Sequence, residues 1–222
     1  MTTLIKRVAD NTDSSSLAAR LRRRRFAFFL SLLETVHRPV RVLDVGGTHR
    51  FWETMGLHEV QGVHVSLLNL SHEPVSSPSL TSLTGDARSL PSIADKSFDV
   101  VFSNSVIEHV GSFSDQQKMA NEVRRVGSRY FVQTPNRYFP IEPHFLVPGF
   151  QFLPLEARVW LSTHFQLGWR PKYADSAEAR KEVARISLLA RRQLAQLFPE
   201  ASLYTERFAG LPKSFVAYSG WR

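Results

Sequence analysis

The chain of 222 residues contains no cysteine. This absence excludes disulfide bonds, metal sites built on thiolates and a cysteine nucleophile. Nowhere do about 18 apolar residues follow one another, so the sequence predicts no membrane-spanning helix. The first 13 residues are polar and lack the apolar core of a signal peptide. We therefore expect a cytoplasmic protein whose first 13 residues form no regular structure.

The sequence also lacks an even distribution of its charged residues. The formal net charge is +8, and the segment up to Arg41 holds nine basic residues against three acidic ones. A protein body that follows nucleic acid normally spreads its positive charge along one face. The charge pattern therefore argues against nucleic acid as the partner. The length and the hydrophobic fraction of 43% fit one α/β domain with an appendage.

That appendage, residues 1–38, is predicted to carry one helix from Leu17 to Val36, capped by the serines before it. Arginines crowd the first half of the helix (Arg20 and Arg22 to Arg25), and Phe26, Phe28 and Phe29 make the second half apolar. One interpretation is a helix packed over the sheet edge with its arginines in water. The other is a basic and aromatic helix in peripheral contact with an anionic membrane surface or a lipid-linked substrate.

A buried strand, residues 41–45, runs into the glycine turn of Gly46 and Gly47. The strand carries Asp44 near its end. A strand that stops in this way leaves backbone N–H groups and a carboxylate facing an open crevice. This arrangement can hold a nucleoside cofactor at the carboxyl ends of a parallel sheet.

Further strands end on polar residues at similar intervals. The second strand ends on Asn69, the third near Asp86 and the fourth at Asn104, and a fifth strand ends at Pro135. Asn69 could instead be a simple turn residue, and Asp86 could cap the next turn. Strands that alternate with helices at this spacing predict an α/β fold with a doubly wound, mostly parallel sheet.

The order of these motifs resembles that of class I S-adenosylmethionine-dependent methyltransferases. The segments that carry the resemblance are Val-Leu-Asp-Val-Gly-Gly (42–47), Asn69, Gly-Asp-Ala (85–87), Phe-Asp-Val-Val (98–101) and Ile-Glu-His-Val (107–110). The chain is most similar to the small-molecule branch typified by ubiquinone-biosynthesis methyltransferases. The resemblance covers residues 40 to 140 and implies a Rossmann-like, seven-stranded sheet that ends in an antiparallel pair.

The resemblance implies S-adenosylmethionine as the cofactor and assigns residues at four strand ends to it. Those implied for the methionine part are Asp44, Gly46, Gly47, Ser103 and Asn104. Those implied for the ribose and adenine are Asn69, Leu70, Asp86 and Ala87. Two positions depart from the family: Thr48 replaces a glycine of the loop, and Asn69 replaces an acid.

The segment after the fifth strand, residues 136–175, is predicted to be an insertion that shapes the acceptor pocket. Four prolines and repeated aromatic residues between Thr134 and Phe150 disfavour regular structure there. His144 lies in this loop and is the first candidate for a general base, because histidine titrates in the useful range. His109 is the second candidate, and Glu142 is a partner of His144 or a base itself. No cluster with metal-ligand spacing is visible, so no metal is predicted.

The sequence thus predicts a methyltransferase, residues 39–222, that methylates a small or lipid-like, largely apolar acceptor at oxygen. Alternatives are an RNA methyltransferase and a non-catalytic module that binds the cofactor. A nicotinamide-dependent enzyme is disfavoured, because the loop lacks G-x-G-x-x-G spacing. The oligomeric state and the accepting molecule are not predicted.

Overall fold

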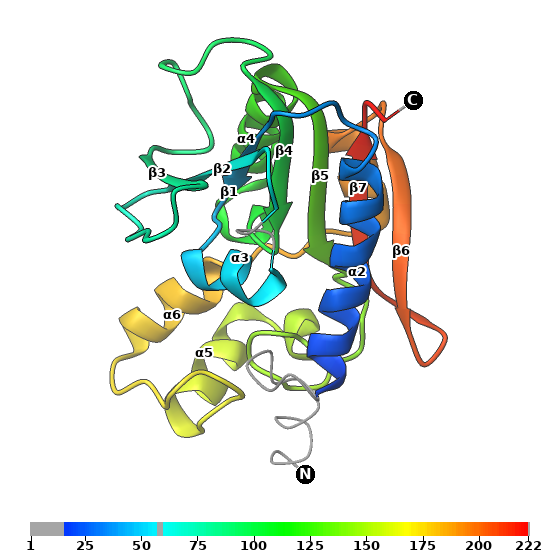
Figure 1. Ribbon diagram of the computed structural model, residues 1–222. Coiled ribbons are helices and arrows are strands. Elements are labelled where there is room, and N and C mark those ends of the chain that lie inside the picture. The colour runs from blue at the N-terminus through cyan, green and yellow to red at the C-terminus, as the bar shows by residue number, and fades with distance from the viewer. Residues whose placement is uncertain (1–15, 57–59, 222) are drawn as a thin grey trace.

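The computed structural model describes residues 16–56 and 60–221, so the first 13 residues lie outside the described part. Its centre is a seven-stranded sheet of order β3-β2-β1-β4-β5-β7-β6 (Figure 1). The strands are β1 (Val40–Val45), β2 (Val63–Asn69), β3 (Leu80–Thr84), β4 (Phe98–Asn104), β5 (Gly127–Pro135), β6 (Ser202–Phe208) and β7 (Leu211–Ser219). The first five are parallel, and β7 runs antiparallel to β5 and β6. This confirms the predicted α/β fold with a doubly wound, mostly parallel sheet.

Helices cover both faces of the sheet. Helices α2 (Leu17–Leu33) and α3 (His49–Met55) share one apolar core with one sheet face. Helices α4 (Phe113–Val126) and α7 (Arg191–Leu197) share a second core with the opposite face. Both sides of the central strands are therefore buried, as their near-continuous apolar sequences require.

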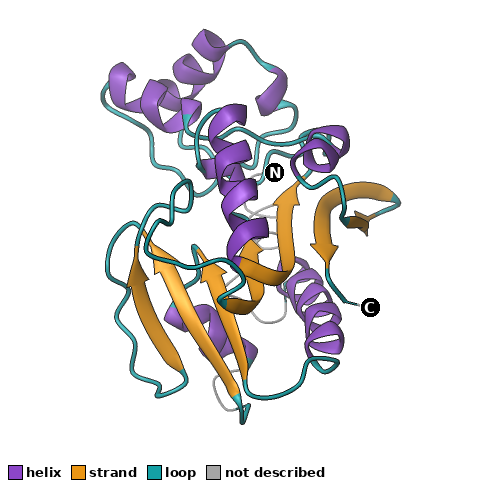
Figure 2. Ribbon diagram, turned by 90° about the horizontal axis from the view of Figure 1, so that it is seen from above, coloured by secondary structure: helices purple, strands orange, loops and turns teal. Residues whose placement is uncertain are grey.

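The insertion lies beyond the end of the sheet at which β5 stops (Figure 1). It contains η3 (Phe150–Phe152) and α5 (Leu155–His164), and α6 (Ser176–Ala184) packs beside α5. Figure 2 shows these short helices gathered at one end of the sheet. The carboxyl ends of the parallel strands therefore face the insertion.

Helix α2 packs on the sheet, in agreement with the first of the two interpretations. Ser16 caps it by accepting a hydrogen bond from the Ala19 N–H group at 3.0 Å. The Phe29 ring lies 4.6 Å from that of Phe102 between centroids. The expectation that all its arginines lie in water is wrong for Arg25, which is 8% exposed and pairs with buried Glu206 on β6.

The segment from Ala177 to Leu197, whose pattern allows one helix or two, forms two helices, α6 and α7. The segment between α6 and α7 lies alongside the residues that follow β5, and there the Arg137 N–H group donates to the Leu189 carbonyl at 3.0 Å. Pro212 lies within β7 and not in the hairpin turn, which is made by Ala209 and Gly210. A register shift at Glu206/Arg207 on the neighbouring strand marks an irregularity there, the setting in which a strand tolerates proline.

Among the described residues, no helix combines the length and the apolar character needed to cross a membrane.

Candidate cofactor and acceptor site

The first part of the site is the turn after β1. Asp44 is 2% exposed, and its Oδ2 atom accepts a hydrogen bond from Trp52 Nε1 at 2.6 Å. Burial raises the pKa of Asp44 to about 7, an effect that the Trp52 hydrogen bond partly opposes. Near neutral pH the Asp44 carboxyl group is therefore partly protonated. A cation that binds beside it favours the ionised form.

The two glycines of this turn are required by close packing. Gly46 has φ +75°, and a Cβ atom on it would lie 2.5 Å from Cγ2 of Val106. A Cβ atom on Gly47 would lie 1.9 Å from Oδ2 of Asp44. The turn thus leaves exposed backbone at Gly46 beside a buried carboxylate, and these residues fit the binding of a nucleoside cofactor.

Asn69, at the end of β2, closes the same turn from the side. Its Nδ2 atom donates to the Gly47 carbonyl at 2.8 Å. The departure at Thr48 is also explained, because Thr48 is the N-cap of α3 and accepts from the Phe51 N–H group at 3.2 Å. Thr48 therefore takes the chain directly from the glycine turn into a helix.

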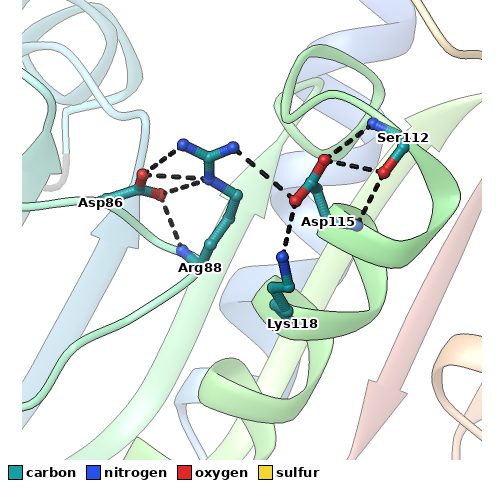
Figure 3. Close-up of polar contacts among 5 residues, drawn as sticks. All are labelled: Asp86, Arg88, Ser112, Asp115 and Lys118. Atoms are coloured by element: carbon teal, nitrogen blue, oxygen red, sulfur yellow. Dashed lines mark hydrogen bonds and ion pairs between the residues drawn. The ribbon is translucent and has the colours of Figure 1, made fainter.

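Asp86 is held by a neighbour, as Figure 3 shows. Arg88 donates to both of its oxygens, at distances of 2.6 to 3.0 Å, and the Arg88 N–H group donates to Oδ1. These bonds hold the pKa of Asp86 below its usual value. Arg88 also lies 3.7 Å from Asp115, which forms the capping box of α4 with Ser112. The turn-capping role offered as the alternative for Asp86 is thus present, and its contact with adenine stays a prediction.

The remaining residues predicted for the cofactor differ in exposure. Leu70 is 76% exposed, whereas Ala87 and Asn104 are half-buried. Ser103 is fully buried, and its hydroxyl donates to the Val45 carbonyl at 3.3 Å. Its side chain therefore ties β4 to β1 inside the sheet.

The three residues predicted for catalysis form one hydrogen-bonded chain. Glu142 Oε1 lies 2.6 Å from Nδ1 of His144, and Nε2 of His144 lies 3.0 Å from Nε2 of His109. The other oxygen of Glu142 accepts from the N–H groups of His144 and Phe145, at 2.7 and 2.6 Å. Burial lowers the pKa of His109 to about 4, so this imidazole is neutral at neutral pH.

Glu108 joins this group from the loop after β4. It is fully buried, Thr134 donates to its Oε2 atom at 3.1 Å, and its Oε1 atom has no hydrogen-bond partner in the described part of the chain. Burial raises its pKa to about 7. The sequence does not identify Glu108 as a site residue beyond its place in the motif of residues 107–110, because a local pattern does not show which way a loop side chain points.

Ligand atoms of Glu108, His109 and His144 lie within 4.8 Å of one another, so this group could hold a metal ion. These distances do not test the prediction of no metal. That prediction rests on spacing along the chain, whereas His109 and His144 are 35 positions apart and meet only through the fold. The group can thus do one of two things: pass a proton along its hydrogen bonds or bind a cation.

A cavity of about 560 Å³ begins at the carboxyl end of β4, beside Asn104 and Ser105. His144 and Glu108 line it, whereas His109 and Glu142 do not. The apolar part of its wall comes from α2 and the insertion, including Leu17, Leu21, Phe139, Ile141, Leu146 and Trp169. Of the three predicted catalytic residues, only His144 therefore faces the space in which an acceptor would lie.

Comparisons with known proteins agree with this geometry. Residues 43–129 match the family model described as a methyltransferase domain. Two uncharacterized proteins of Mycobacterium tuberculosis, from strains H37Rv and CDC 1551, are 39% identical to the chain over 67 residues, or 30% of this chain. The match spans about a quarter, 23%, of the length of these curated relatives.

Solved structures show the same fold. A S-adenosylmethionine-dependent methyltransferase from Methanosarcina mazei matches 84% of this chain and 94% of its own, with 13% identity and a TM-score of 0.52. A protein from Pyrococcus horikoshii matches 93% of this chain and 91% of its own, with 14% identity and a TM-score of 0.53. The branch typified by ubiquinone biosynthesis is not distinguished by these comparisons. Residues 43–129 thus match a methyltransferase domain, and the chain shares its fold with a solved S-adenosylmethionine-dependent methyltransferase.

Proposed function

We propose that this chain transfers a methyl group to a hydroxyl oxygen of a small or lipid-like, largely apolar acceptor bound in the cavity. The proposal depends on one observation: His144 lies at the wall of a largely apolar cavity, and Glu142 orients its ring. This cavity opens beside the end of β4. Bound S-adenosylmethionine supplies a methyl group that its positive sulfonium already activates. The protein then has to align the acceptor and take up its proton.

The hydrogen bonds define how His144 takes this proton. An ionised Glu142 only accepts, so Nδ1 of His144 carries the hydrogen and Nε2 carries the lone pair. A hydroxyl of the acceptor replaces His109 at Nε2 and gives up its proton there. Before an acceptor binds, neutral His109 donates from Nε2 to this lone pair and so keeps Nε2 of His144 in place until the hydroxyl displaces it. Glu142 and His109 are positioning residues in this account.

Two other functions have less support. The exposed Arg20, Arg23 and Arg24 of α2 are compatible with an RNA methyltransferase, but Arg22 and Arg25 line the cavity instead. The apolar face of α2 packs on the sheet, which leaves its phenylalanines unavailable for the proposed membrane contact. A non-catalytic module would bind the cofactor without turnover, and it would not need the hydrogen-bonded chain of Glu142, His144 and His109 beside the cavity.

Transfer of a labelled methyl group to fractionated cell extract tests the proposal. We expect mass spectrometry to find the label on an apolar molecule, as a methyl ether. Label on RNA alone, or on nothing while the cofactor binds, would contradict it.

The metal alternative gives a separate prediction. If His144 is a base, removing metal ions with EDTA leaves turnover unchanged, and added Zn²⁺ inhibits by occupying Nε2 of His144. Turnover measured after dialysis against EDTA, with and without added Zn²⁺, checks this. Loss of turnover in EDTA that Zn²⁺ restores would instead assign the cluster to a metal.

The pKa of Asp44 gives a prediction for cofactor affinity. Below pH 7 the buried carboxyl is mostly neutral, and a cationic ligand favours its ionised form. Affinity for S-adenosylhomocysteine, which carries an ammonium group, should therefore rise about tenfold from pH 6 to pH 8. Calorimetry at several pH values measures it. Asp44→Asn should bind more weakly and without this slope; a wild-type affinity that is flat over the same range would contradict the role of Asp44.

A further inference from the structure

The wall of the cavity also carries a group of cations. Arg22 and Arg25 reach it from α2, and Lys213 reaches it from β7. These three residues are called the cationic wall below. The wall brings together residues almost 200 positions apart, so no local sequence pattern reveals it.

Positive charge on the wall exceeds the negative charge that faces it. Glu206 accepts from Arg25 Nη1 at 3.0 and 3.1 Å and from Lys213 Nζ at 3.3 Å. Ser214 donates to the same carboxylate at 2.9 Å, and Glu206 is 3% exposed. One carboxylate thus serves two cations, and Arg22 pairs with no carboxylate within residues 16–56 and 60–221.

Other charged groups of the cavity do not remove this excess. Arg170 lines the cavity but pairs with Glu182 at 3.3 Å. Glu108 lines the cavity beside His144 and adds one carboxylate to Glu206 and Glu182, so three carboxylates face the four cations Arg22, Arg25, Arg170 and Lys213. Burial and the charge of Arg25 both lower the pKa of Arg22, in keeping with the lack of a carboxylate partner for Arg22 among the described residues. An excess charge that is partly removed from water is costly unless an anion pairs with it.

The strand order gives the distance between the β4 end of the cavity and the strand that carries Lys213. The β4 end carries Asn104 and Ser105, whereas the Lys213 carbonyl accepts from the Asn136 N–H group just after β5, at 2.9 Å. From β4 the sheet continues through β5 to β7. Two strand spacings of about 4.8 Å place the β7 backbone that carries Lys213 about 10 Å from the β4 end.

We infer that the acceptor is an amphiphile with an oxyanion, either a carboxylate or a phosphate, that binds the cationic wall while its methylated atom lies at the β4 end of the cavity. Its apolar body lies between the oxyanion and this atom, against the apolar residues of α2 and the insertion. Arginine is suited to this task, because its guanidinium donates two parallel hydrogen bonds to carboxylate or phosphate. This inference rests on the proposed function and narrows its substrate class.

Binding of three probes with the same chain tests it: octanoate, octyl phosphate and octanol. Calorimetry with protein saturated in S-adenosylhomocysteine should show that at least one anion binds about tenfold more tightly than octanol, since charge-assisted hydrogen bonds have this strength. The tighter anion identifies the head group. Arg22→Gln should weaken that anion about tenfold and leave octanol unchanged, because this variant breaks no ion pair of the described chain.

Arg24→Gln is the matched control, because Arg24 lies on the same helix and is exposed. It should bind all three probes as the wild type does. The inference is overturned if octanol binds as tightly as both anions, if neither anion binds, or if Arg24→Gln weakens the anions as much as Arg22→Gln does. Heat from S-adenosylhomocysteine is measured first, and its absence in the wild type would reject the proposed function instead.

Discussion

Replacing His144 by alanine is expected to lower kcat by about 10²-fold or more, the usual effect of losing a general base. His144 is the member of the Glu142–His144–His109 chain that lines the cavity, so the variant removes the group that takes the acceptor's proton. Affinity for S-adenosylhomocysteine should stay unchanged. Turnover of the acceptor found in the labelling experiment, measured from pH 6 to 9, checks the prediction.

His164→Ala is the matched control, since His164 is an exposed histidine of α5. Its turnover should equal that of the wild type. Glu142→Gln should lower kcat less than His144→Ala and shift the pH profile, because it weakens the partner that stabilises protonated His144. If His144→Ala turns over at the wild-type rate across this pH range, His144 is only a packing residue. Alignment of the methyl donor with the acceptor would then account for the rate without a general base.

Replacing Gly46 by alanine should lower cofactor affinity by about 10²-fold or more, because a misplaced binding turn loses several contacts at once. The added Cβ would lie 2.5 Å from Val106, so the turn after β1 has to move away from the loop that follows β4. Calorimetry with S-adenosylhomocysteine measures the loss.

Gly210→Ala separates this effect from backbone strain. Gly210 has φ +80°, close to the +75° of Gly46, but a Cβ atom on it would meet nothing within 4 Å. Both variants carry the strain of a left-handed residue, and we expect similar losses of melting temperature from it. Only Gly46→Ala should lose the cofactor; equal affinities in the two variants would show that the turn does not contact it.

The strand ends could be predicted from the sequence because each is a local pattern. Asp44, Asn69 and Asn104 follow apolar strands directly, and parallel strands bring their carboxyl ends to one edge. The helical pattern from Ala177 to Leu197 allows one helix or two, and the break between α6 and α7 depends on pairing with the chain after β5.

The parts of the site that depend on distant residues were not predictable. Arg25 and Glu206 are 181 positions apart, and burial of both depends on how α2 crosses the sheet. Arginines at the start of a helix usually lie in water, so the local pattern favoured the wrong environment for Arg25. The meeting of His109 and His144 likewise depends on how the insertion folds back over the sheet. The residues were predicted as candidates, whereas their contact needed the structure.

Calorimetric titration of the wild-type chain with S-adenosylhomocysteine tests whether the chain binds the cofactor on which the proposed methyl transfer depends. The account predicts one site per chain with micromolar affinity, about −8 kcal/mol, and weaker binding in Asp44→Ala. A titration that gives no heat with S-adenosylhomocysteine or S-adenosylmethionine, while NAD binds, would contradict it.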